Sequence, residues 1–403
     1  MDLKSGYPFW AVKNGLMHAF PRLEADRLCD VAVLGGGITG ALIADELAKH
    51  GHDVVVVEQR DVGWGSTAAS TALLQYEIDT HMVDLAKQHG QADAVLAYQA
   101  CAAAIPMLQA LAAEVRDVDF GMMDSLYYAS KRRHGSDLRE EYALRKRHGF
   151  DVELLERGAL QARFGIDAPV AILSHQAARI DPYRMAYRLL ARLHKAGAGV
   201  YDRTTVERIE TSPRGVALHT PEGHSVRAKH LVLAAGYANQ GWLKQRVAQN
   251  RSSYAFITDP IDDARLGALK RTMMWESARP YLYLRSTGDG RLLVGGEDDA
   301  VDIPAKRDAR VGRKAAILCK QVEKLLPHLS ITPVFAWAGT FAETGDGLPF
   351  FGPHDQHGPR VHFAMAYGGN GITYSMLGAG LLRALIERRK HPLARLFSFG
   401  RLN

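Results

Sequence analysis

The residues best suited to chemistry are the glycines of the stretch 35–40, which reads Gly-Gly-Gly-Ile-Thr-Gly, and the acidic residue Glu58 that follows them. Gly35 permits a tight turn, Gly37 lets the backbone approach a pyrophosphate, and Gly40 allows a helix to pack closely on a strand. The carboxylate of Glu58 can accept hydrogen bonds from ribose hydroxyls, and its charge disfavours a 2′-phosphate. These residues predict a dinucleotide site, with a ligand-free glycine turn as the alternative. The motif alone does not separate FAD from NAD.

The elements around the glycines fit a βαβ unit. The apolar run 31–34 predicts a buried strand, residues 40–50 predict a helix, and residues 54–57 predict a second buried strand. The start of that helix would offer free N–H groups and positive partial charge to phosphates. We therefore expect a Rossmann-type domain with a right-handed crossover.

The rest of the chain alternates between helical and extended patterns. The predicted elements are a helix at 82–113 that Pro106 breaks or kinks, a helix at 182–194, a strand at 231–234, an antiparallel hairpin at 281–294 and a final helix at 375–390. We predict an α/β plus α+β fold, in which a Rossmann-type domain is interleaved with a substrate domain built on an antiparallel sheet. The predicted segments are 1–90, 151–240 and 335–403 for the Rossmann-type domain, and 91–150 and 241–334 for the substrate domain.

The composition excludes several function classes. The chain has 403 residues, of which 47% are hydrophobic and 23% charged, so it can bury a core and is not a disordered or collagen-like chain. The net charge of +6 is a mild basic bias, and basic residues are not interleaved with aromatics, so we expect no nucleic-acid partner. The 3 cysteines lie far apart without metal-ligand spacing, which predicts no metal site and fits a reducing compartment. We expect a soluble cytoplasmic protein without a membrane-spanning segment.

Further short motifs extend the pattern over nearly the whole chain. They are the small-residue loop 63–71, Asp181-Pro182, Thr205-Val206, Ala234-Ala235-Gly236, the stretch 337–349 and the glycine loop 367–372. Together with the first glycine turn, this set resembles the superfamily of FAD-dependent oxidoreductases that contains D-amino-acid oxidase, glycine oxidase and sarcosine oxidase. The stretches 7–10 and 62–66 look most like the branch that contains gamma-glutamylputrescine oxidase.

The resemblance implies an extended FAD, with its adenosine at the first glycine turn and its isoalloxazine ring at the interface with the antiparallel domain. The loop 368–372 would open the last helix toward flavin N1 and O2, where the helix dipole favours negative charge. Sarcosine oxidases tether the flavin through a cysteine near the position of Gly339, so we expect noncovalent FAD. The implied FAD contacts are Gly35, Gly37, Ile38, Thr39, Gly40, Glu58, Gln59, Arg60, Gly65, Ser66, Thr67, Thr71, Val206, Ala235, Gly236, Gly339, Gly368, Gly369, Asn370, Gly371, Ile372 and Thr373.

The resemblance leaves the substrate site less defined. Sarcosine oxidases hold the substrate carboxylate with an arginine and a lysine at positions that here read Gln75 and Thr373. Glycine oxidases use an arginine where this chain has Phe341, so the carboxylate clamp of those enzymes is missing. Arg285 in the predicted hairpin is the remaining candidate for a bidentate carboxylate contact, with a structural ion pair as the alternative.

The candidate substrate-site residues are Gln75, Tyr254, Tyr283 and Arg285. The resemblance places Tyr254 on a strand beside the flavin ring, where it could shape the pocket with its ring and hydroxyl, and a core tyrosine is the alternative. Tyr283 stands beside Arg285 in the predicted hairpin. No residue is required as a general base, because a neutral amine can pass a hydride directly to flavin N5.

The expected reaction is FAD-dependent oxidation of a C–N bond in a small amine or amino acid, giving an imine that water hydrolyses. No lysine occurs between Lys270 and Lys306, where sarcosine oxidases carry one over the flavin, which favours a quinone or protein electron acceptor over a fast oxidase reaction. The alternatives are oxidation of a C–O bond in a 2-hydroxy acid, and a flavin subunit that needs a partner protein. Residues 131–149, rich in Lys and Arg, predict a solvated helical face or the docking surface for that partner. The substrate, its stereochemistry and the oligomeric state are left open.

Overall fold

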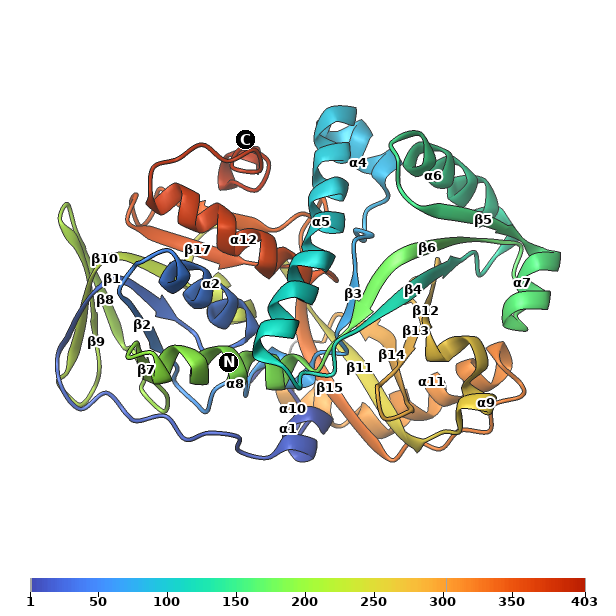
Figure 1. The fold of residues 1–403 in the computed structure, drawn as a ribbon, viewed down its shortest axis with the longest axis horizontal. Helices are drawn as coiled ribbons and strands as arrows, with labels where there is room; N and C mark the ends of the chain where they lie inside the picture. The colour runs from blue at the N-terminus through green and yellow to red at the C-terminus, as the bar shows by residue number, and fades with distance from the viewer. Residues whose placement is uncertain (1, 302, 403) are drawn as a thin grey trace.

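The computed structural model describes residues 2–301 and 303–402 and contains two β-sheets with helices packed around them. Figure 1 shows one sheet on the left with α2, α8 and α12, the other on the right with α6 and α11, and the long helix α5 between them. This arrangement confirms the predicted combination of a Rossmann-type domain and a second, mainly antiparallel sheet.

The first sheet, called the nucleotide sheet below, is parallel at its centre. Strand β1 pairs with β10 on one side and with β2 on the other, which confirms the strands predicted at 31–34, 54–57 and 231–234. The predicted segments 31–34, 54–57 and 231–234 are almost fully buried, as continuous apolar runs in a covered parallel sheet require. The order is β16 (Phe350–Pro353), β17 (Val361–Met365), β10 (Ser225–Leu233), β1 (Arg27–Leu34), β2 (Val54–Val57) and β7 (Gly199–Tyr201), with β9 (Gly215–His219) paired to β10 and β8 (Arg208–Ser212) paired to β9.

The second sheet, called the substrate sheet below, is antiparallel except where β12 and β4 run parallel. The predicted hairpin is confirmed, since Tyr283 pairs with Gly295 and Ser286 with Leu292. The order is β15 (Phe335–Glu343), β11 (Gln249–Pro260), β14 (Arg291–Asp299), β13 (Tyr283–Ser286), β12 (Thr272–Glu276), β4 (Gly121–Tyr128), β6 (Val170–Arg179) and β3 (Leu73–Gln75), with β5 (Val152–Glu156) paired to β6.

Helices pack on both sheets and connect them. The α-helices are α1 (Phe9–Asn14), α2 (Ile38–Lys49), α3 (Ser66–Ala69), α4 (Met82–His89), α5 (Gln91–Val115), α6 (Gly135–Arg147), α7 (Arg157–Phe164), α8 (Pro182–Lys195), α9 (Asp263–Leu266), α10 (Pro304–Asp308), α11 (Val311–Leu325) and α12 (Gly371–Ile386). Short 3-10 helices are η1 (Arg132–His134), η2 (Gly236–Trp242), η3 (Gly267–Lys270) and η4 (Phe399–Leu402). The last long helix starts at Gly371 rather than at the predicted residue 375, so the glycine loop leads directly into it.

The predicted domain boundaries are wrong for several segments. Strands β5 and β6 fall in the segment 151–240 predicted for the Rossmann-type domain, but they join β4 in the substrate sheet. Strand β15, predicted with residues 335–403, pairs with β11 in the same sheet. Helix α5, predicted with the substrate domain, lies between the two sheets, because it packs on α12 and α8 and also contacts β3 and β6 of the substrate sheet. Apolar strands of both sheets look alike in sequence, so the pattern cannot assign a strand to its sheet.

Helix α5 runs unbroken through Pro106, contrary to the predicted break. The break lies at Gly90, whose φ of +87° is in the left-handed region that favours glycine. Among the described residues, α5 is the one helix long and apolar enough to cross a membrane by length and composition, and 44% of that stretch is buried within the protein. A buried core helix meets the same criteria, so the absence of a membrane span stays a prediction.

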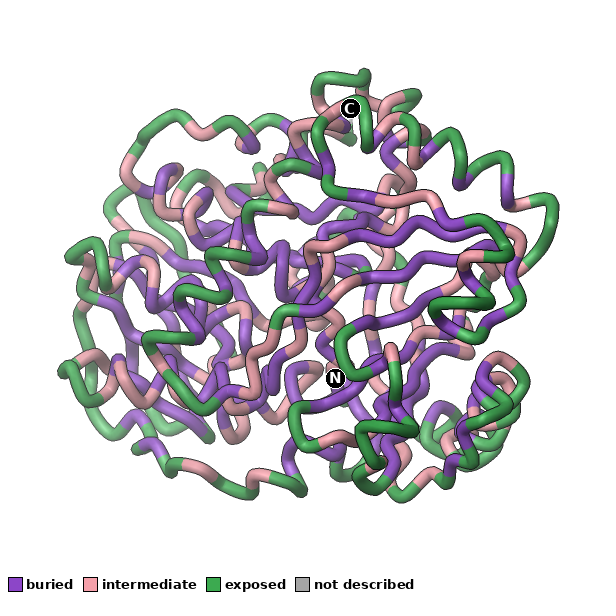
Figure 2. The backbone as a smooth tube through the Cα atoms, turned by 45° about the vertical axis from the view of Figure 1, so that its right-hand side comes forward, coloured by how far each residue is buried: buried purple, intermediate pink, exposed green. Residues whose placement is uncertain are grey.

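The burial pattern places the core along the strands of both sheets and at the central helix, with exposed backbone in the outer loops (Figure 2).

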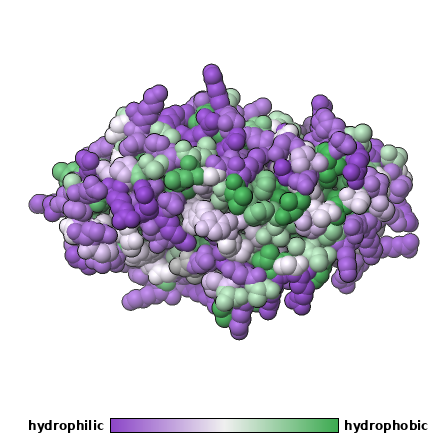
Figure 3. Space-filling view, turned by 90° about the horizontal axis from the view of Figure 1, so that it is seen from below, coloured by the Kyte–Doolittle hydropathy of each residue, from purple (hydrophilic) through white to green (hydrophobic). Residues whose placement is uncertain are grey.

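The basic region 131–149 forms η1 and α6, as predicted, but it is not a uniformly solvated face. The side chain of Arg145 is fully buried and lies 2.7 Å from the carboxylate of Glu141. Seen from below, hydrophobic residues gather from the middle of the surface toward the right, and hydrophilic residues dominate both ends (Figure 3).

Candidate active site

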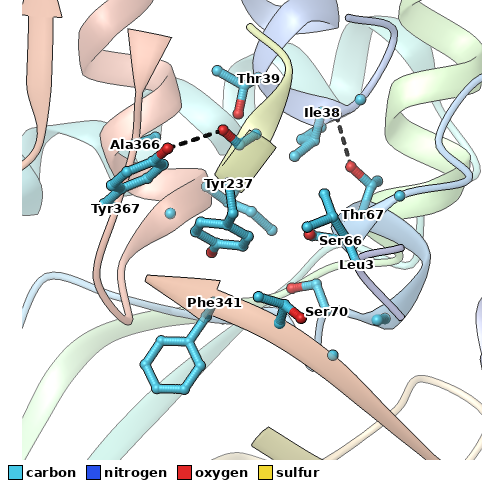
Figure 4. Close-up of a pocket in the computed structure, with 18 of the residues that line it drawn as sticks. Leu3, Ile38, Thr39, Ser66, Thr67, Ser70, Tyr237, Phe341, Ala366 and Tyr367 are labelled. Atoms are coloured by element: carbon cyan, nitrogen blue, oxygen red, sulfur yellow. Dashed lines mark hydrogen bonds between the residues drawn. The ribbon is translucent and has the colours of Figure 1, made fainter. Parts of the chain in front are cut away.

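A cavity of about 380 Å³ lies at the junction of the two sheets. It is lined by every predicted FAD contact except Gly40, and by Gln75, Tyr283 and Phe341 from the substrate side. Figure 4 shows Ser66 and Thr67 on one side of this cavity and Tyr237 and Tyr367 on the other, with Phe341 on β15 below them. The cavity therefore joins residues that are far apart in the sequence, and its volume is in the range of small-molecule sites.

The first glycine turn is shaped by close backbone contacts. Gly35 has a φ of +120°, and a Cβ atom there would lie 2.4 Å from the carbonyl oxygen of Ala234. A Cβ atom on Gly40 would lie 1.9 Å from the carbonyl oxygen of Gly35. Gly40 thus acts by letting α2 pack against the turn, which explains why it is absent from the cavity lining.

The start of α2 and the start of α3 meet at the cavity. The backbone N–H of Ile38 donates to Thr67 Oγ1 at 3.0 Å, drawn as a dashed line in Figure 4. Ser66 Oγ is buried and, among the described residues, has no hydrogen-bond partner. A buried hydroxyl without a partner is costly, so a polar ligand group beside Ser66 would satisfy it. This end of the cavity fits the phosphates of a dinucleotide.

Glu58 lines the cavity at the end of β2, as predicted. Its two carboxylate oxygens accept hydrogen bonds from the backbone N–H of Gly36 at 2.8 Å and of Arg60 at 2.9 Å. Burial raises the pKa of Glu58, and these two N–H groups oppose that shift. Because each oxygen can accept more than one hydrogen bond, the carboxylate keeps capacity for ribose hydroxyls.

The glycine loop before α12 is anchored to the chain just after β3. The amide of Asn370 donates to the carbonyl oxygens of Gln75 at 3.1 Å and Glu77 at 2.9 Å. Thr373 Oγ1 donates to the same Gln75 carbonyl at 3.2 Å. The N–H of Gly369 donates to Asp79 Oδ2, so this donor is already used within the protein. The first-turn N–H groups of α12 have no intrahelical acceptor, and they are the donors that remain for a ligand.

The structure contradicts the predicted substrate role of Arg285. Its side chain is fully buried and is absent from the cavity lining. The guanidinium donates to the backbone carbonyls of Thr71 at 2.8 Å, Ser286 at 3.1 Å and Ile180 at 3.1 Å. Arg285 therefore holds three segments together, and these partners are carbonyls rather than the carboxylate expected in the structural alternative.

The other substrate-site candidates divide into two groups. Tyr254 is buried in the core behind the sheet, where its hydroxyl lies 3.2 Å from Asp299 Oδ2, and it does not line the cavity. Tyr283 and Gln75 do line it, and the Tyr283 hydroxyl lies 3.1 Å from Ser253 Oγ. Tyr254 on β11 and Tyr283 on β13 face opposite sides of the substrate sheet, and the sequence does not show which face of each strand is turned to the cavity.

Four further residues of the substrate end were not predicted: Asp79, Trp275, Tyr281 and Asp298. Tyr281 starts the predicted hairpin, and Asp298 lies near the end of its second strand, so the hairpin itself was the signal that could have pointed to them. Trp275 stacks on Tyr127 with ring centroids 3.8 Å apart, which fixes that wall of the cavity. The lining of this end contains two carboxylates, and the one arginine among the described lining residues, Arg60, lies at the Glu58 end.

None of the cysteines lines the cavity in the described part of the chain, and no cluster of His, Cys, Asp or Glu there could hold a metal ion.

The fold and the cavity together define a dinucleotide-binding protein whose cofactor site opens onto a second sheet. The family model described as "DAO: FAD dependent oxidoreductase" matches residues 30–385. The chain belongs to this family, and it is an enzyme that uses FAD.

Known relatives cover nearly all of the chain. Glycine oxidase of Geobacillus kaustophilus is 27% identical over 90% of this chain and 93% of that protein. Gamma-glutamylputrescine oxidoreductase of Escherichia coli is 26% identical over 94% of this chain and 88% of that protein. The crystal structure of L-proline dehydrogenase from P. horikoshii superposes with a TM-score of 0.77 at 17% identity, covering 93% of this chain and 97% of that one, which supports the fold.

Proposed function

We propose that the protein catalyses FAD-dependent oxidation of a C–N bond in a small amine or amino acid, to an imine that water then hydrolyses. The observation that carries this proposal is the acidic substrate end, where Asp79 and Asp298 line the cavity and the described lining of this end contains no lysine or arginine. The guanidinium of Arg279 lies outside this lining and donates to the backbone carbonyl oxygen of Asp79 at 3.2 Å. Two carboxylates attract an ammonium group and repel the carboxylate of a 2-hydroxy acid. Relatives named glycine oxidase and gamma-glutamylputrescine oxidoreductase agree with this substrate class.

The cavity residues would bind and orient both molecules. Bound FAD would supply the hydride acceptor, and the protein supplies placement and electrostatics. Ser66, Thr67 and the start of α2 would hold the phosphates, and Glu58 would hold the ribose. The N–H groups at the start of α12 would favour negative charge placed against them. Trp275, Tyr281 and Tyr283 would form the aromatic walls of the substrate end.

The cofactor would be held without a covalent bond. Position 339, where the resemblance expects a tether in some relatives, is glycine, and its Cβ position lies 3.0 Å from Ala69 Cβ. Denaturation with acid should release all flavin into the supernatant. Colour that stays with the precipitated polypeptide would contradict a noncovalent cofactor.

A quinone or protein acceptor is the proposed destination of the electrons, in a cytoplasmic protein. No lysine lines the cavity among the described residues, so no ammonium group is present there to promote electron transfer to dioxygen. The reduced protein should therefore reoxidise slowly in air and quickly with a soluble quinone. Rapid reoxidation by air alone would favour an oxidase.

A substrate panel tests the proposed reaction. Primary amines, secondary amines, amino acids and 2-hydroxy acids are mixed with the protein under argon, and the products are identified after flavin bleaching. We expect an aldehyde, ketone or 2-oxo acid together with released ammonia or amine. A 2-oxo acid from a 2-hydroxy acid, with no reaction of any amine, would establish C–O oxidation instead. Reduction only in the presence of a second protein would favour the flavin-subunit alternative.

A further inference from the structure

Asp298 is a carboxylate in the cavity with one oxygen left without a donor. It lies near the end of β14 and lines the substrate end beside Ser253 and Tyr283. Its Oδ1 atom is buried and, within the described part of the chain, accepts no hydrogen bond. The Tyr283 ring packs tightly on the same strand, because a Cβ atom on Gly295 would lie 2.4 Å from ring atoms. The carboxylate is thus held in a narrow, aromatic-walled space.

Asp79, the other carboxylate at the substrate end, differs in this respect. Asp79 Oδ2 accepts the hydrogen bond from Gly369 N at 2.8 Å, and the hydroxyl of Tyr281 lies 3.5 Å from its Oδ1. Both oxygens of Asp79 therefore already have protein partners. Asp298 is therefore the carboxylate with a buried oxygen that lacks a hydrogen bond, and a hydrogen-bond donor on a bound ligand would satisfy it.

The charges around Asp298 come from several elements. Burial raises the pKa of Asp298 to about 7, and the negative charges of Asp79 and Glu343 act in the same direction. The hydroxyl of Ser253 and the positive charge of Arg279 oppose the shift. Tyr281 and Tyr283 face the same space, and burial raises the pKa of both phenols, so they stay neutral near pH 7. An ionised Asp298 in this setting is stabilised by a cation that also donates hydrogen bonds.

We propose that Asp298 binds the amino group of the substrate and accepts its proton, which makes cationic amines without a neighbouring carboxylate the substrate class. The inference rests on the proposed function. The ammonium R–NH₃⁺ donates to the free oxygen and gives up one proton, so that R–NH₂ and the neutral Asp298 carboxyl result. The nitrogen lone pair is then free, as hydride loss from the adjacent carbon requires. An amino acid would place its own carboxylate among the carboxylates of this end, whose described lining contains no arginine or lysine. Arg279 lies outside the lining, where its guanidinium already donates to the carbonyl oxygen of Asp79 at 3.2 Å and stacks over the Tyr281 ring, 4.4 Å from the ring centroid.

Binding of two probes of equal shape and opposite charge tests the proposal. The probes are tert-butylamine, which has no hydrogen on the carbon next to nitrogen and cannot be oxidised, and pivalate. The FAD-loaded protein is titrated with each, and the change in flavin absorption gives the affinity. We expect tert-butylammonium to bind and pivalate not to bind. Equal or tighter binding of pivalate would overturn the proposal.

Two variants sharpen this test. Asp298→Asn should weaken tert-butylammonium binding by about tenfold or more, since a hydrogen bond between charged groups is lost. Asp299→Asn is the matched control, because its carboxylate pairs with Arg310 at 2.7 Å and does not line the cavity; its probe affinity should stay within about twofold. An Asp298→Asn protein that binds the probe as tightly as the wild type would contradict the assigned role.

The pH dependence of probe binding to the wild type provides a readout that does not need the variant to fold, and the pH profile of the variant provides a second readout. Wild-type affinity for tert-butylammonium should fall as the pH drops through about 7, because Asp298 takes up a proton and loses its charge. With an oxidisable amine, Asp298→Asn should move the pH profile of flavin reduction to higher pH, toward the pKa of the free amine. Unchanged profiles in both experiments would overturn the proposal. Because tert-butylamine is not oxidised, a failure of the substrate panel would reject the proposed reaction without affecting these binding results.

Discussion

Gly40 packs directly against the backbone of Gly35: a Cβ atom at Gly40 would lie 1.9 Å from the Gly35 carbonyl oxygen. This contact brings the start of α2 against the end of β1, where the cavity begins. The two glycines therefore set the position of the first-turn N–H groups of α2 relative to the cavity. Any side chain at residue 40 must push the helix away from the turn.

Gly40→Ala should lower both stability and FAD retention. The new methyl group meets backbone rather than a flexible side chain, so we expect a loss of about 2 kcal/mol or more and a fall in Tm of several degrees. Thermal unfolding and the flavin content of the purified protein measure the two effects. Gly380→Ala in α12 is the matched control, because nothing lies within 4 Å of its Cβ position and alanine favours the helix. Equal effects at both positions would argue against the packing role of Gly40.

Ser66→Ala should weaken FAD binding without destabilising the apoprotein. Ser66 Oγ is buried without a partner in the described structure, so its removal costs the empty protein no hydrogen bond. In the loaded protein, the loss of one hydrogen bond to a charged phosphate reduces affinity by about tenfold. Thr67→Val is the contrast, because Thr67 Oγ1 accepts from Ile38 N and its loss should lower the Tm of the apoprotein as well. FAD titration and apoprotein melting separate the cases, and unchanged FAD affinity in Ser66→Ala would contradict a phosphate contact.

Arg285→Met should reduce stability rather than select among substrates. Three backbone carbonyls lose their donor inside the protein, which costs about 3 kcal/mol or more. Denaturant unfolding measures this loss, with the exposed Arg246→Met as the control. If the folded variant instead showed a raised KM for acidic amines and an unchanged KM for uncharged ones, Arg285 would have to reach the substrate.

Asp298→Asn should stabilise the apoprotein in a pH-dependent way. The folded-state pKa of about 7 is raised above the ordinary value of 3.8, so the folded protein binds more protons between these values and loses stability as the pH rises through them. Asparagine removes the cost of the buried charge. The Tm difference between variant and wild type should grow from near zero at low pH to a positive plateau above about 7. A difference that does not change with pH would mean that Asp298 is not the titrating group.

The cofactor end could be predicted from sequence because its signals are local. Gly35, Gly37 and Glu58 lie within one βαβ unit, and the loop 368–372 leads directly into a helix. The substrate end depends on long-range pairing. The hairpin pattern predicts that β14 lies beside β13, but nothing near Asp298 in the sequence shows that β14 also lies beside β11, and this second pairing brings Asp298 next to Ser253.

The prediction for Arg285 failed for a related physical reason. A charged residue in a hairpin is usually exposed, but the carbonyls of two distant segments and of the neighbouring Ser286 surround this guanidinium, which is fully buried. The predicted domain segments do not match the observed sheets where apolar strands of one sheet follow those of the other along the chain. The resemblance to a family showed that separate motifs along the chain belong to one cofactor site, and the local residue pattern around each motif could not show this.

The central claim is that FAD bound in this cavity takes a hydride from an amine. Single-turnover reduction under argon tests it most directly, with an amine from the substrate panel compared with the same amine deuterated at the carbon next to nitrogen. We predict that the amine bleaches the oxidised flavin and that deuterium slows the bleaching. A protein whose flavin is reduced by dithionite but by no amine would contradict the claim.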